Sequence, residues 1–403
     1  MKVVVASAGR FHAFDLARQM DRLGYLERLF TAYPMAKVDG LPRARVSTFP
    51  WLMAPASAAG KLGLPGLRDL INVPVIETFD RWMAAQLGPC DVFHCLSQFG
   101  MRTHRVARER FGALTVCDRG SSHILFQDEV LREEYARWDV PYRGPHPRIV
   151  ERELAEYEYC DLITVPSSFA MRTFVERGVP AEKLRLVPYG VDLRMFHPAP
   201  RIERPFRVLF VGTVSVRKGI GYLLEAIAAL RIPGLEVWVV GEIDASARAV
   251  LAKYDGLFRY LGVLPRARLH EYYSQGSVLV LPSVEEGLAL VQAQAMACGL
   301  PVIATTNTGA EDLFTDGVEG FIVPIRDAAA IREKIEMLYA DPALRERMAS
   351  AALERVRSLG GWNSYGEKMA ACYAAALRTR ADRQSGHANP LRGGERALPF
   401  QRA

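Results

Sequence analysis

The sequence has no paired cysteines and no long apolar runs. Its six cysteines, among 403 residues, form no Cys-x-x-Cys pair, so neither a disulfide framework nor a thiolate metal site is expected. No apolar stretch approaches the ~20 residues that span a bilayer. The opening residues, MKVVVASAGRF, resemble a short strand followed by polar residues rather than a secretion signal. We therefore expect a cytoplasmic protein, with any membrane contact made peripherally at the inner face.

Basic residues outnumber acidic ones mainly in the first third of the chain. The formal net charge is +6, and residues 1–127 carry 16 Lys and Arg against 10 Asp and Glu. This excess is compatible with phosphorylated small molecules or an anionic membrane surface as partners. Nucleic acid is not expected, because the basic residues are not interleaved with aromatic ones along one periodic face.

Two series of short apolar runs, separated by helical patterns, divide the chain. This alternation is typical of parallel α/β sheets, and two doubly wound halves would bind ligands between them, at the carboxyl ends of the strands. The proline-rich and charged segment His197–Pro205 separates the halves. The expected strands are Lys2–Ser7, Asp91–His94, Leu114–Cys117, Asp161–Val165 and Leu184–Pro188, then Phe206–Gly212, Glu236–Gly241, Phe258–Leu261, Val278–Leu281, Pro301–Ala304 and Gly320–Val323.

These patterns predict a first domain over residues 1–197 and a second over 198–378. A helix at about 361–378 can pack back on the first domain. Residues 379–403 are polar and lack apolar periodicity, so we expect a disordered tail there. The stretch Gly40–Val75 interrupts the alternation, and two interpretations stay open: an insertion that faces a membrane or a substrate, and an irregular, partly buried loop.

The segment Leu281–Asp327 holds the residues best suited to a binding site. A strand leads into a loop with Glu285 and Glu286, and Gly287 is expected to open a helix over Leu288–Cys298. Backbone N–H groups at a helix N-terminus suit an anionic or hydroxyl-rich ligand, and a glycine allows close approach. Glu286 and Gln294 are about two helical turns apart, so both can point into one cleft.

This segment resembles the signature of family four of the retaining glycosyltransferases, which have the GT-B fold of two Rossmann-like domains. The matching residues are Pro282, Ser283, Glu286, Gly287, Ala295, Met296, Ala297, Gly299, Pro301, Val302 and Ile303. The resemblance implies transfer of a sugar from a UDP-sugar or GDP-sugar to an acceptor hydroxyl, with no cofactor. The acceptor is expected to be a glycan or a lipid-linked carrier, as in surface polysaccharide synthesis.

The resemblance also implies roles for the residues around Glu286. Glu286 would contact the donor sugar, and the donor loop would continue through Gly287, Leu288, Ala289 and Leu290. Leu288 and Ala289 stand where the family has Phe-Gly. The second family glutamate, which grips the ribose, is Gln294 here, and an amide can still hydrogen-bond a hydroxyl without bringing a charge.

A second loop, Val211–Gly219, follows one expected strand and precedes a helix. Such a turn presents backbone amides, here including Gly212, and cations to a diphosphate. The resemblance implies that Lys218 holds the leaving group, while the family's arginine is Thr213 here. Arg217 is either a replacement for that arginine or a solvated basic residue. No Asp-x-Asp triplet is present, so no metal site is implied and cations would neutralise the diphosphate.

The first domain contributes further candidates. His123 resembles the family histidine that reaches the donor sugar across the cleft; the other interpretation is a partly exposed loop histidine. Gly9, Arg10 and His12 lie where the family has a glycine-rich acceptor loop. Gly190 is expected to adopt a backbone conformation that favours glycine.

These residues predict a metal-independent reaction with retention of configuration. The departing phosphate would help to deprotonate the acceptor, and Lys218 would hold the leaving group. Glu286 and His123 would position the donor sugar and stabilise the transition state rather than attack. The alternative is a catalytically silent nucleotide-sugar-binding protein or partner subunit, which Thr213 and Gln294 favour because both depart from the family at donor-binding positions.

Overall fold

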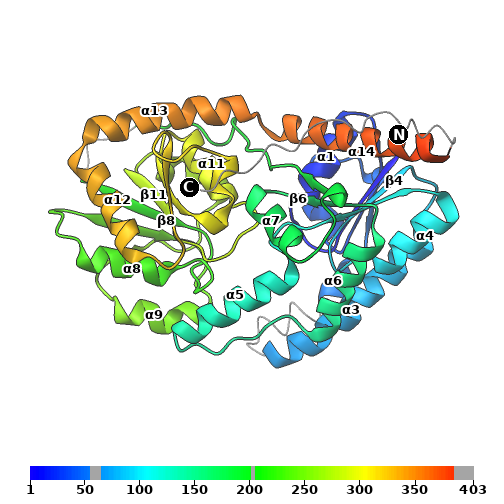
Figure 1. The fold of residues 1–403 in the computed structure, drawn as a ribbon, viewed down its shortest axis with the longest axis horizontal. Coiled ribbons are helices and arrows are strands. Elements are labelled where there is room, and N and C mark those ends of the chain that lie inside the picture. Colours follow the sequence, from blue (N-terminus) through cyan, green and yellow to red (C-terminus); the bar gives the residue numbers. More distant parts are fainter. Residues whose placement is uncertain (55–64, 201–204, 385–403) are drawn as a thin grey trace, which may run out of the picture.

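The computed structural model describes residues 1–54, 65–200 and 205–384, and within them the chain forms two lobes. Each lobe is built on one parallel β-sheet covered by helices (Figure 1). The first sheet has seven strands in the order β3-β2-β1-β4-β5-β6-β7, and the second has six in the order β10-β9-β8-β11-β12-β13. The expected α/β class with two doubly wound halves is confirmed.

The strands of the first lobe are short and largely apolar, as expected for a sheet covered on both faces. They are β1 (Val3–Ser7), β2 (Leu26–Thr31), β3 (Val46–Thr48), β4 (Val92–Leu96), β5 (Leu114–Asp118), β6 (Leu162–Val165) and β7 (Leu184–Leu186). Its helices are α1 (Ala13–Arg22), α3 (Pro65–Gln86), α4 (Met101–Phe111), α5 (Ile124–Arg137), α6 (Pro147–Tyr159) and α7 (Ser168–Glu176).

The second lobe repeats this alternation. Its strands are β8 (Arg207–Val211), β9 (Glu236–Val240), β10 (Arg259–Tyr260), β11 (Val278–Leu281), β12 (Val302–Thr305) and β13 (Gly320–Val323). The helices that follow are α8 (Ile220–Ala229), α9 (Arg248–Lys253), α10 (Leu269–Tyr273), α11 (Leu290–Ala297), α12 (Ala328–Ala340), α13 (Pro342–Leu359) and α14 (Trp362–Gln384). None of the helices in the described ranges is both long and apolar enough to cross a bilayer.

Local sequence explains where several helices begin. Ser167 caps α7 by accepting a hydrogen bond from the Ala170 N–H at 3.0 Å, and Asp327 caps α12 from the Ala330 N–H at 2.8 Å. Pro147 stands in the first turn of α6, where its missing N–H costs nothing. These caps fix the strand-to-helix turns that surround the cleft.

The stretch Gly40–Val75 is more regular than an irregular loop. It contains β3, which pairs in parallel with β2, and the beginning of α3 at Pro65. Residues 55–64 lie outside the described residues, as do residues 201–204 of the expected linker. The interpretation as an irregular, partly buried loop is therefore wrong for β3 and for the residues of α3, and it holds for the rest of residues 40–54.

Two helices tie the lobes together. Helix α5 belongs to the first lobe by sequence, yet its Val130 and Leu131 pack in the core of the second lobe. Helix α14 returns to the first lobe along the upper edge of Figure 1, where Tyr365 and Tyr373 join the core around α1. Because α14 extends to Gln384, the expectation of a disordered tail is wrong for residues 379–384; residues 385–403 lie outside the described residues.

Gly190 lies where the returning chain crosses the first lobe. Among the described residues it is not one of those with a positive φ, so the expected special backbone conformation is wrong. A Cβ on Gly190 would instead lie 2.4 Å from the Gly361 carbonyl carbon and from the Trp362 nitrogen. Glycine is required here because two backbone segments touch.

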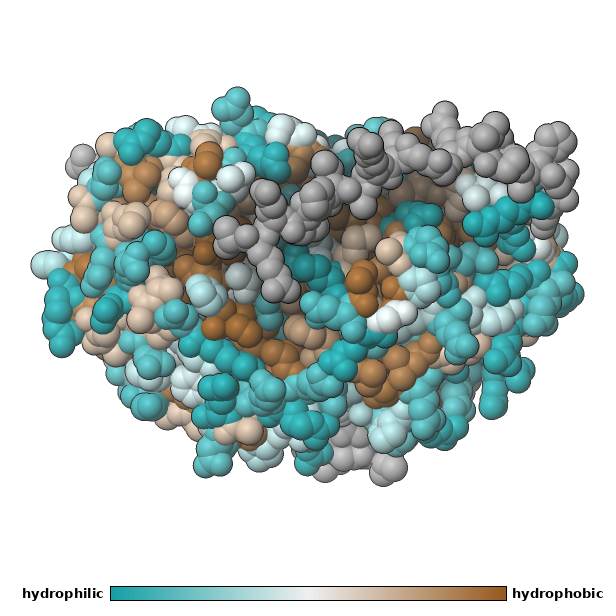
Figure 2. Space-filling model, viewed as in Figure 1, coloured by the Kyte–Doolittle hydropathy of each residue, from teal (hydrophilic) through white to brown (hydrophobic). Residues whose placement is uncertain are grey.

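Apolar side chains also reach the surface where the lobes meet. Figure 2 shows them gathered across the middle of this face, within an otherwise mainly polar surface. Trp138, just after α5, contacts Tyr222 of the second lobe with ring centroids 5.3 Å apart, and a Cβ on Gly221 would lie 2.3 Å from the Trp138 ring. The lobes thus share an apolar contact beside the polar one described below.

Candidate active site

The candidate site lies where the carboxyl ends of the two sheets face each other. The loop after β11 carries Gly287, and the loop after β5 carries Gly120. A Cβ on Gly287 would lie only 2.0 Å from the Gly120 carbonyl oxygen. In addition, Ser167 of the first lobe donates a hydrogen bond to the Gly287 carbonyl oxygen at 2.5 Å. The donor loop predicted from sequence is therefore in direct contact with the first lobe.

The two loops of the second lobe that were predicted to bind the donor pack on each other. Gly219 has φ +69°, and a Cβ on it would lie 1.9 Å from the Pro282 carbonyl oxygen. This contact brings Lys218 beside Glu286, and the Lys218 Nζ forms an ion pair with Glu286 Oε1. Both side chains are largely buried. The structure thus brings together the cation and the carboxylate that the sequence places at the leaving group and the donor sugar.

Arg217 is ion-paired, although its side chain remains 35% exposed. Its guanidinium forms an ion pair with Glu285 Oε2 at 2.9 Å, and its Nε donates to the Glu285 carbonyl oxygen at 3.1 Å. It also donates to Ser121 Oγ of the first lobe at 3.4 Å. The positive charge of Arg217 is balanced by a carboxylate, whereas Thr213 is exposed at the start of the same loop.

Glu285 is the residue at this junction that sequence reasoning missed. It is fully buried, and one oxygen accepts hydrogen bonds from Ser121 Oγ at 2.7 Å and Ser122 Oγ at 2.6 Å. Gln127 Nε2 donates to the other oxygen at 2.9 Å. Burial alone would raise the pKa of Glu285, but Arg217 and these hydrogen bonds hold it at about 2. A carboxylate of the second lobe is therefore bound by several side-chain hydrogen-bond donors of the first lobe.

The rest of the donor segment differs in part from expectation. Helix α11 begins at Leu290 rather than at Leu288, because Ala289 has extended backbone angles. Leu288 and Ala289 are buried in the second-lobe core, and Leu290 is partly buried. The Gln294 side chain accepts a hydrogen bond from the Tyr273 hydroxyl at 3.2 Å. Gly212 directly follows β8 and has φ +138°.

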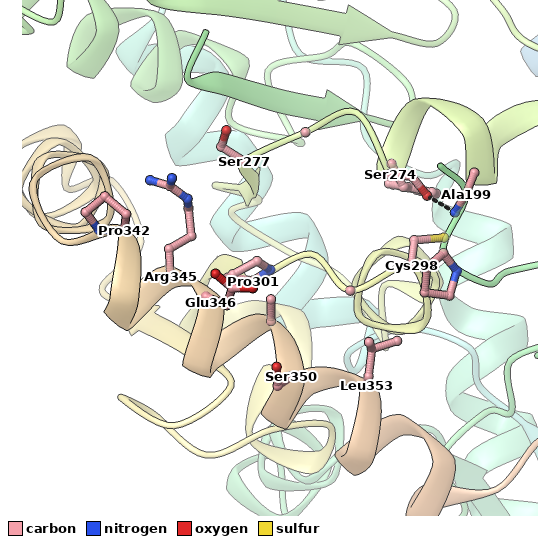
Figure 3. Close-up of a pocket in the computed structure, with 15 residues that line it drawn as sticks. Ala199, Ser274, Ser277, Cys298, Pro301, Pro342, Arg345, Glu346, Ser350 and Leu353 are labelled. Carbon is pink, nitrogen blue, oxygen red and sulfur yellow. Dashed lines mark hydrogen bonds between the residues drawn. The ribbon is translucent and has the colours of Figure 1, made fainter. Parts of the chain in front are cut away.

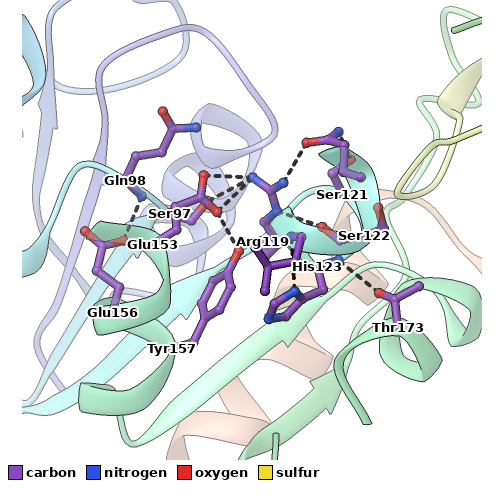
Figure 4. Close-up of polar contacts among 12 residues, drawn as sticks. Ser97, Gln98, Arg119, Ser121, Ser122, His123, Glu153, Glu156, Tyr157 and Thr173 are labelled. Atoms are coloured by element: carbon purple, nitrogen blue, oxygen red, sulfur yellow. Dashed lines mark hydrogen bonds and ion pairs between the residues drawn. The ribbon is translucent and has the colours of Figure 1, made fainter. Parts of the chain in front are cut away.

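His123 lies in an apolar setting. Its imidazole packs against Tyr157 and Phe174, with ring centroids 5.2 and 4.9 Å apart, and the residue is 2 % exposed. Its Nδ1 caps α5 by accepting from the Leu125 N–H at 3.3 Å, and its own N–H donates to Thr173 (Figure 4). Burial, with Arg119 and Arg177 nearby, lowers the pKa of His123 to about 4. The ring is thus held as a neutral helix cap, and the interpretation as a partly exposed loop histidine is wrong.

A second imidazole lies at the end of β5. His12 Nε2 is 2.5 Å from Asp118 Oδ2, and its ring stacks on Tyr189 with centroids 4.4 Å apart. Asp118 also accepts from Thr164 Oγ1 at 3.0 Å, and His94 Nε2 lies 3.1 Å from Oδ2. Burial would raise the pKa of Asp118, but His12 and His94 hold it well below its usual range.

The other two acceptor-loop candidates contact their own surroundings. Arg10 is exposed and forms an ion pair with Asp39 at 2.8 Å. The Gly9 carbonyl oxygen accepts from Ser7 Oγ at 2.9 Å, and the Phe11 ring covers its Cα. Among the described residues, no group of three His, Cys, Asp or Glu side chains is arranged to hold a metal ion.

A cavity of 360 Å³ lies at the other end of the second sheet, at the amino ends of strands β11 and β12 (Figure 3). Its lining includes Ser277 and Pro301, which directly precede β11 and β12, and Glu346 and Ser350 of α13. Glu285 and Glu286 follow the other end of β11, so this cavity is separate from the candidate site.

The architecture defines a GT-B protein, in which the loop after β11 of one Rossmann-like lobe faces the strand ends of the other. The family described as "Glycosyl transferases group 1" matches residues 205–341. The D-inositol 3-phosphate glycosyltransferase of Geodermatophilus obscurus is 30% identical, over 73% of this chain and 68% of that protein. The chain belongs to this family, family four of the retaining glycosyltransferases.

Other relatives agree with this assignment, and two solved structures share the fold. The D-inositol 3-phosphate glycosyltransferase of Kribbella flavida is 27% identical over 92% of this chain and 91% of its own length, and that of Pseudarthrobacter chlorophenolicus is 31% identical over 61% and 63%. The fold resembles sucrose-phosphate synthase from Thermosynechococcus elongatus, with a TM-score of 0.68 at 21% identity over 94% of this chain and 100% of that chain. It also resembles HepE from Anabaena in complex with UDP and glucose, with a TM-score of 0.65 at 15% identity over 93% and 100%.

Proposed function

We propose that this glycosyltransferase moves a sugar from a nucleoside diphosphate sugar, without a metal ion, onto an acceptor hydroxyl. The observation that carries the proposal is the pairing of Lys218 with Glu286 at the carboxyl ends of β8 and β11. A cation there can neutralise the leaving diphosphate, and a carboxylate can contact the sugar hydroxyls. UDP in the HepE structure supports a uridine nucleotide as the first choice.

The chemistry follows from groups that are fixed before the substrates bind. The Lys218 ammonium stabilises charge that develops on the departing phosphate, and the departing phosphate oxygen takes the proton of the acceptor hydroxyl on the same face. Gly287 lets the first-lobe backbone cover the donor loop, so water is excluded when the lobes are closed.

Replacing Lys218 by alanine should weaken nucleotide binding more than tenfold, because a charge-assisted hydrogen bond to phosphate contributes about 1.5–3 kcal/mol. The measurement is the rise in melting temperature with UDP, GDP, ADP or CMP, with and without magnesium. A ligand that binds only the native state must raise this temperature. One diphosphate should stabilise the wild type without metal and lose its effect in Lys218→Ala.

Lys253→Ala is the matched control, since Lys253 is an exposed lysine at the end of α9 in the same lobe. It should keep the full nucleotide shift. No shift of the wild type with any nucleotide at millimolar concentration would contradict the proposal. Binding without turnover of any sugar nucleotide would instead favour the silent binder, with Thr213 and Gln294 as its cause.

For the acceptor, we propose a glycan or lipid-linked hydroxyl at an anionic membrane surface. Trp51 is 79% exposed in the first lobe. It lines a largely apolar hollow together with Phe49, Leu52, Pro74 and Val75. Aromatic and aliphatic side chains on a basic lobe suit an interface with anionic headgroups.

The acceptor of the named relatives, D-inositol 3-phosphate, is the alternative. Vesicles with anionic lipid should retain the wild type in a flotation assay, and Trp51→Ala should reduce that retention severalfold. Absence of vesicle binding, together with turnover on soluble D-inositol 3-phosphate, would contradict the membrane acceptor and leave the donor chemistry intact.

A further inference from the structure

The orientation of the His12 ring leaves one nitrogen for a ligand. Its Nε2 faces Asp118 Oδ2 at 2.5 Å and the Tyr189 hydroxyl at 3.4 Å. Because Asp118 is a carboxylate that only accepts, Nε2 carries a hydrogen, and Nδ1 is the ring nitrogen left for a ligand. Within the described part of the chain, Nδ1 has no hydrogen-bond partner and is not among the buried unsatisfied atoms.

The open edge of this ring borders the donor loop. A Cβ on Gly120 would lie 3.1 Å from His12 Cε1 and 3.7 Å from Nδ1, and the Gly120 carbonyl oxygen packs on the Cα of Gly287. Gly120 therefore lies against both the imidazole and the loop that carries Glu286. Because Gly120 has no side chain, the Cε1–Nδ1 edge of the ring is not covered at this position.

His123 is more tightly packed than His12. Its Nδ1 is used as a helix cap, and Tyr157 and Phe174 pack against the ring, so only Nε2 is left for a ligand. The family resemblance nevertheless identified His123 as the histidine that reaches the donor sugar. In this fold a second first-lobe imidazole, that of His12 near the start of the chain, borders Gly120, which contacts the donor loop.

We infer that His12, held by Asp118, contacts a hydroxyl of the bound sugar or acceptor through Nδ1 and takes the place that the resemblance gave to His123. This inference deepens the proposed glycosyl transfer and rests on it. Asp118 is a positioning residue, because it fixes the tautomer and the orientation of the ring without touching substrate. His94, whose Nδ1 accepts from the Tyr373 hydroxyl at 2.8 Å, supports Asp118 from the side of α14.

The test compares two matched substitutions in the full-length protein, His12→Asn and His123→Asn. Asparagine can still cap α5 at position 123, so fold and cap are retained there. Release of UDP or GDP is measured with UDP-glucose, UDP-N-acetylglucosamine and GDP-mannose, each with water, D-inositol 3-phosphate or a lipid-linked glycan in anionic vesicles as the acceptor. We expect kcat to fall about 10-fold in His12→Asn with an unchanged donor KM, which corresponds to about 1.4 kcal/mol, within the net contribution of one hydrogen bond. The kcat of His123→Asn should stay within about twofold of the wild-type kcat. That limit corresponds to about 0.4 kcal/mol in activation free energy.

The role of Asp118 is tested by a double-mutant cycle. Asp118→Asn should lower kcat about as much as His12→Asn, and the double variant should be no worse than either, because both act through one imidazole. Additive losses would overturn the positioning role. If Asp118→Asn does not fold, the comparison of kcat between His12→Asn and His123→Asn tests the role of His12 by itself.

The outcomes separate this inference from the proposed function. A wild type that turns over none of the three donors overturns the proposed function, and this inference with it. An active wild type in which His12→Asn keeps full kcat, or in which only His123→Asn loses it at an unchanged melting temperature, overturns this inference alone.

Discussion

Replacing Gly287 by alanine should lower turnover at least about 10²-fold, since a misplacement of about 1 Å between reacting groups can cost that much. The added Cβ would lie 2.0 Å from the Gly120 carbonyl oxygen and 2.9 Å from the Ser121 Cα. Both atoms belong to the backbone of the opposite lobe, so no rotamer change relieves the clash. The lobes must separate, which moves His12 and Ser167 away from the donor loop.

Nucleotide binding should survive this substitution, because Lys218 and Glu286 both belong to the second lobe. The measurement is UDP release, read together with the rise in melting temperature that the stabilising nucleotide causes. Gly88→Ala is the control, since a Cβ there meets nothing within 4 Å. Turnover of Gly287→Ala close to that of the wild type would show that the two glycines need not touch during the reaction. Loss of nucleotide binding would show that the second lobe itself was disturbed.

The sequence predicted those parts of the site that lie within one loop or one strand-to-helix turn. Lys218 and Glu286 could be found because their spacing from neighbouring glycines follows a family pattern, and the two turns belong to one sheet. Glu285 could not be found in this way. Its partners Ser121, Ser122 and Gln127 come from the other lobe, and sequence patterns do not define how two lobes meet.

The same limit explains the two histidines. His123 follows a strand closely in sequence, which favoured it as the imidazole at the cleft, but the turn into α5 points its ring at Tyr157. His12 and Asp118 are far apart in sequence, and only the parallel arrangement of β1, β4 and β5 brings their strand ends together. An aspartate that ends an otherwise apolar strand, as Asp118 does, was the available signal that a buried polar partner exists.

Missed secondary structure has a local cause. Strand β2 carries Glu27 and Arg28 between its apolar residues, and β3 has three residues, so neither shows a continuous apolar run. In α5, Val130 and Leu131 pack on the second lobe while Glu134 pairs there with Arg326 at 2.7 Å. The first turn of that helix packs on its own lobe, and the apolar residues further along it are directed at the other lobe.

Replacing Glu285 by alanine should lower the free energy of unfolding by about 3–5 kcal/mol, the usual cost of removing one partner of a buried ion pair. The substitution leaves Arg217 without its carboxylate. It also leaves the hydrogen-bond donors of Ser121, Ser122 and Gln127 without an acceptor at the contact between the two lobes. Turnover should fall with stability, because these contacts hold the first lobe against the loop that carries Glu286. Thermal unfolding and UDP release measure the two effects.

Glu285→Gln gives the charge contribution by itself, because its shape is retained. With a native pKa of about 2 against an ordinary value of 4.5, the carboxylate stabilises the folded state fully above the ordinary value. It loses that contribution as the pH falls toward 2. The difference in melting temperature between wild type and Glu285→Gln should therefore be large at pH 7 and smaller at pH 3, whereas exposed Glu354→Gln in α13 should show little difference at either pH. A Glu285→Gln difference that does not depend on pH would mean that shape and hydrogen bonding, rather than the charge facing Arg217, hold the two lobes together.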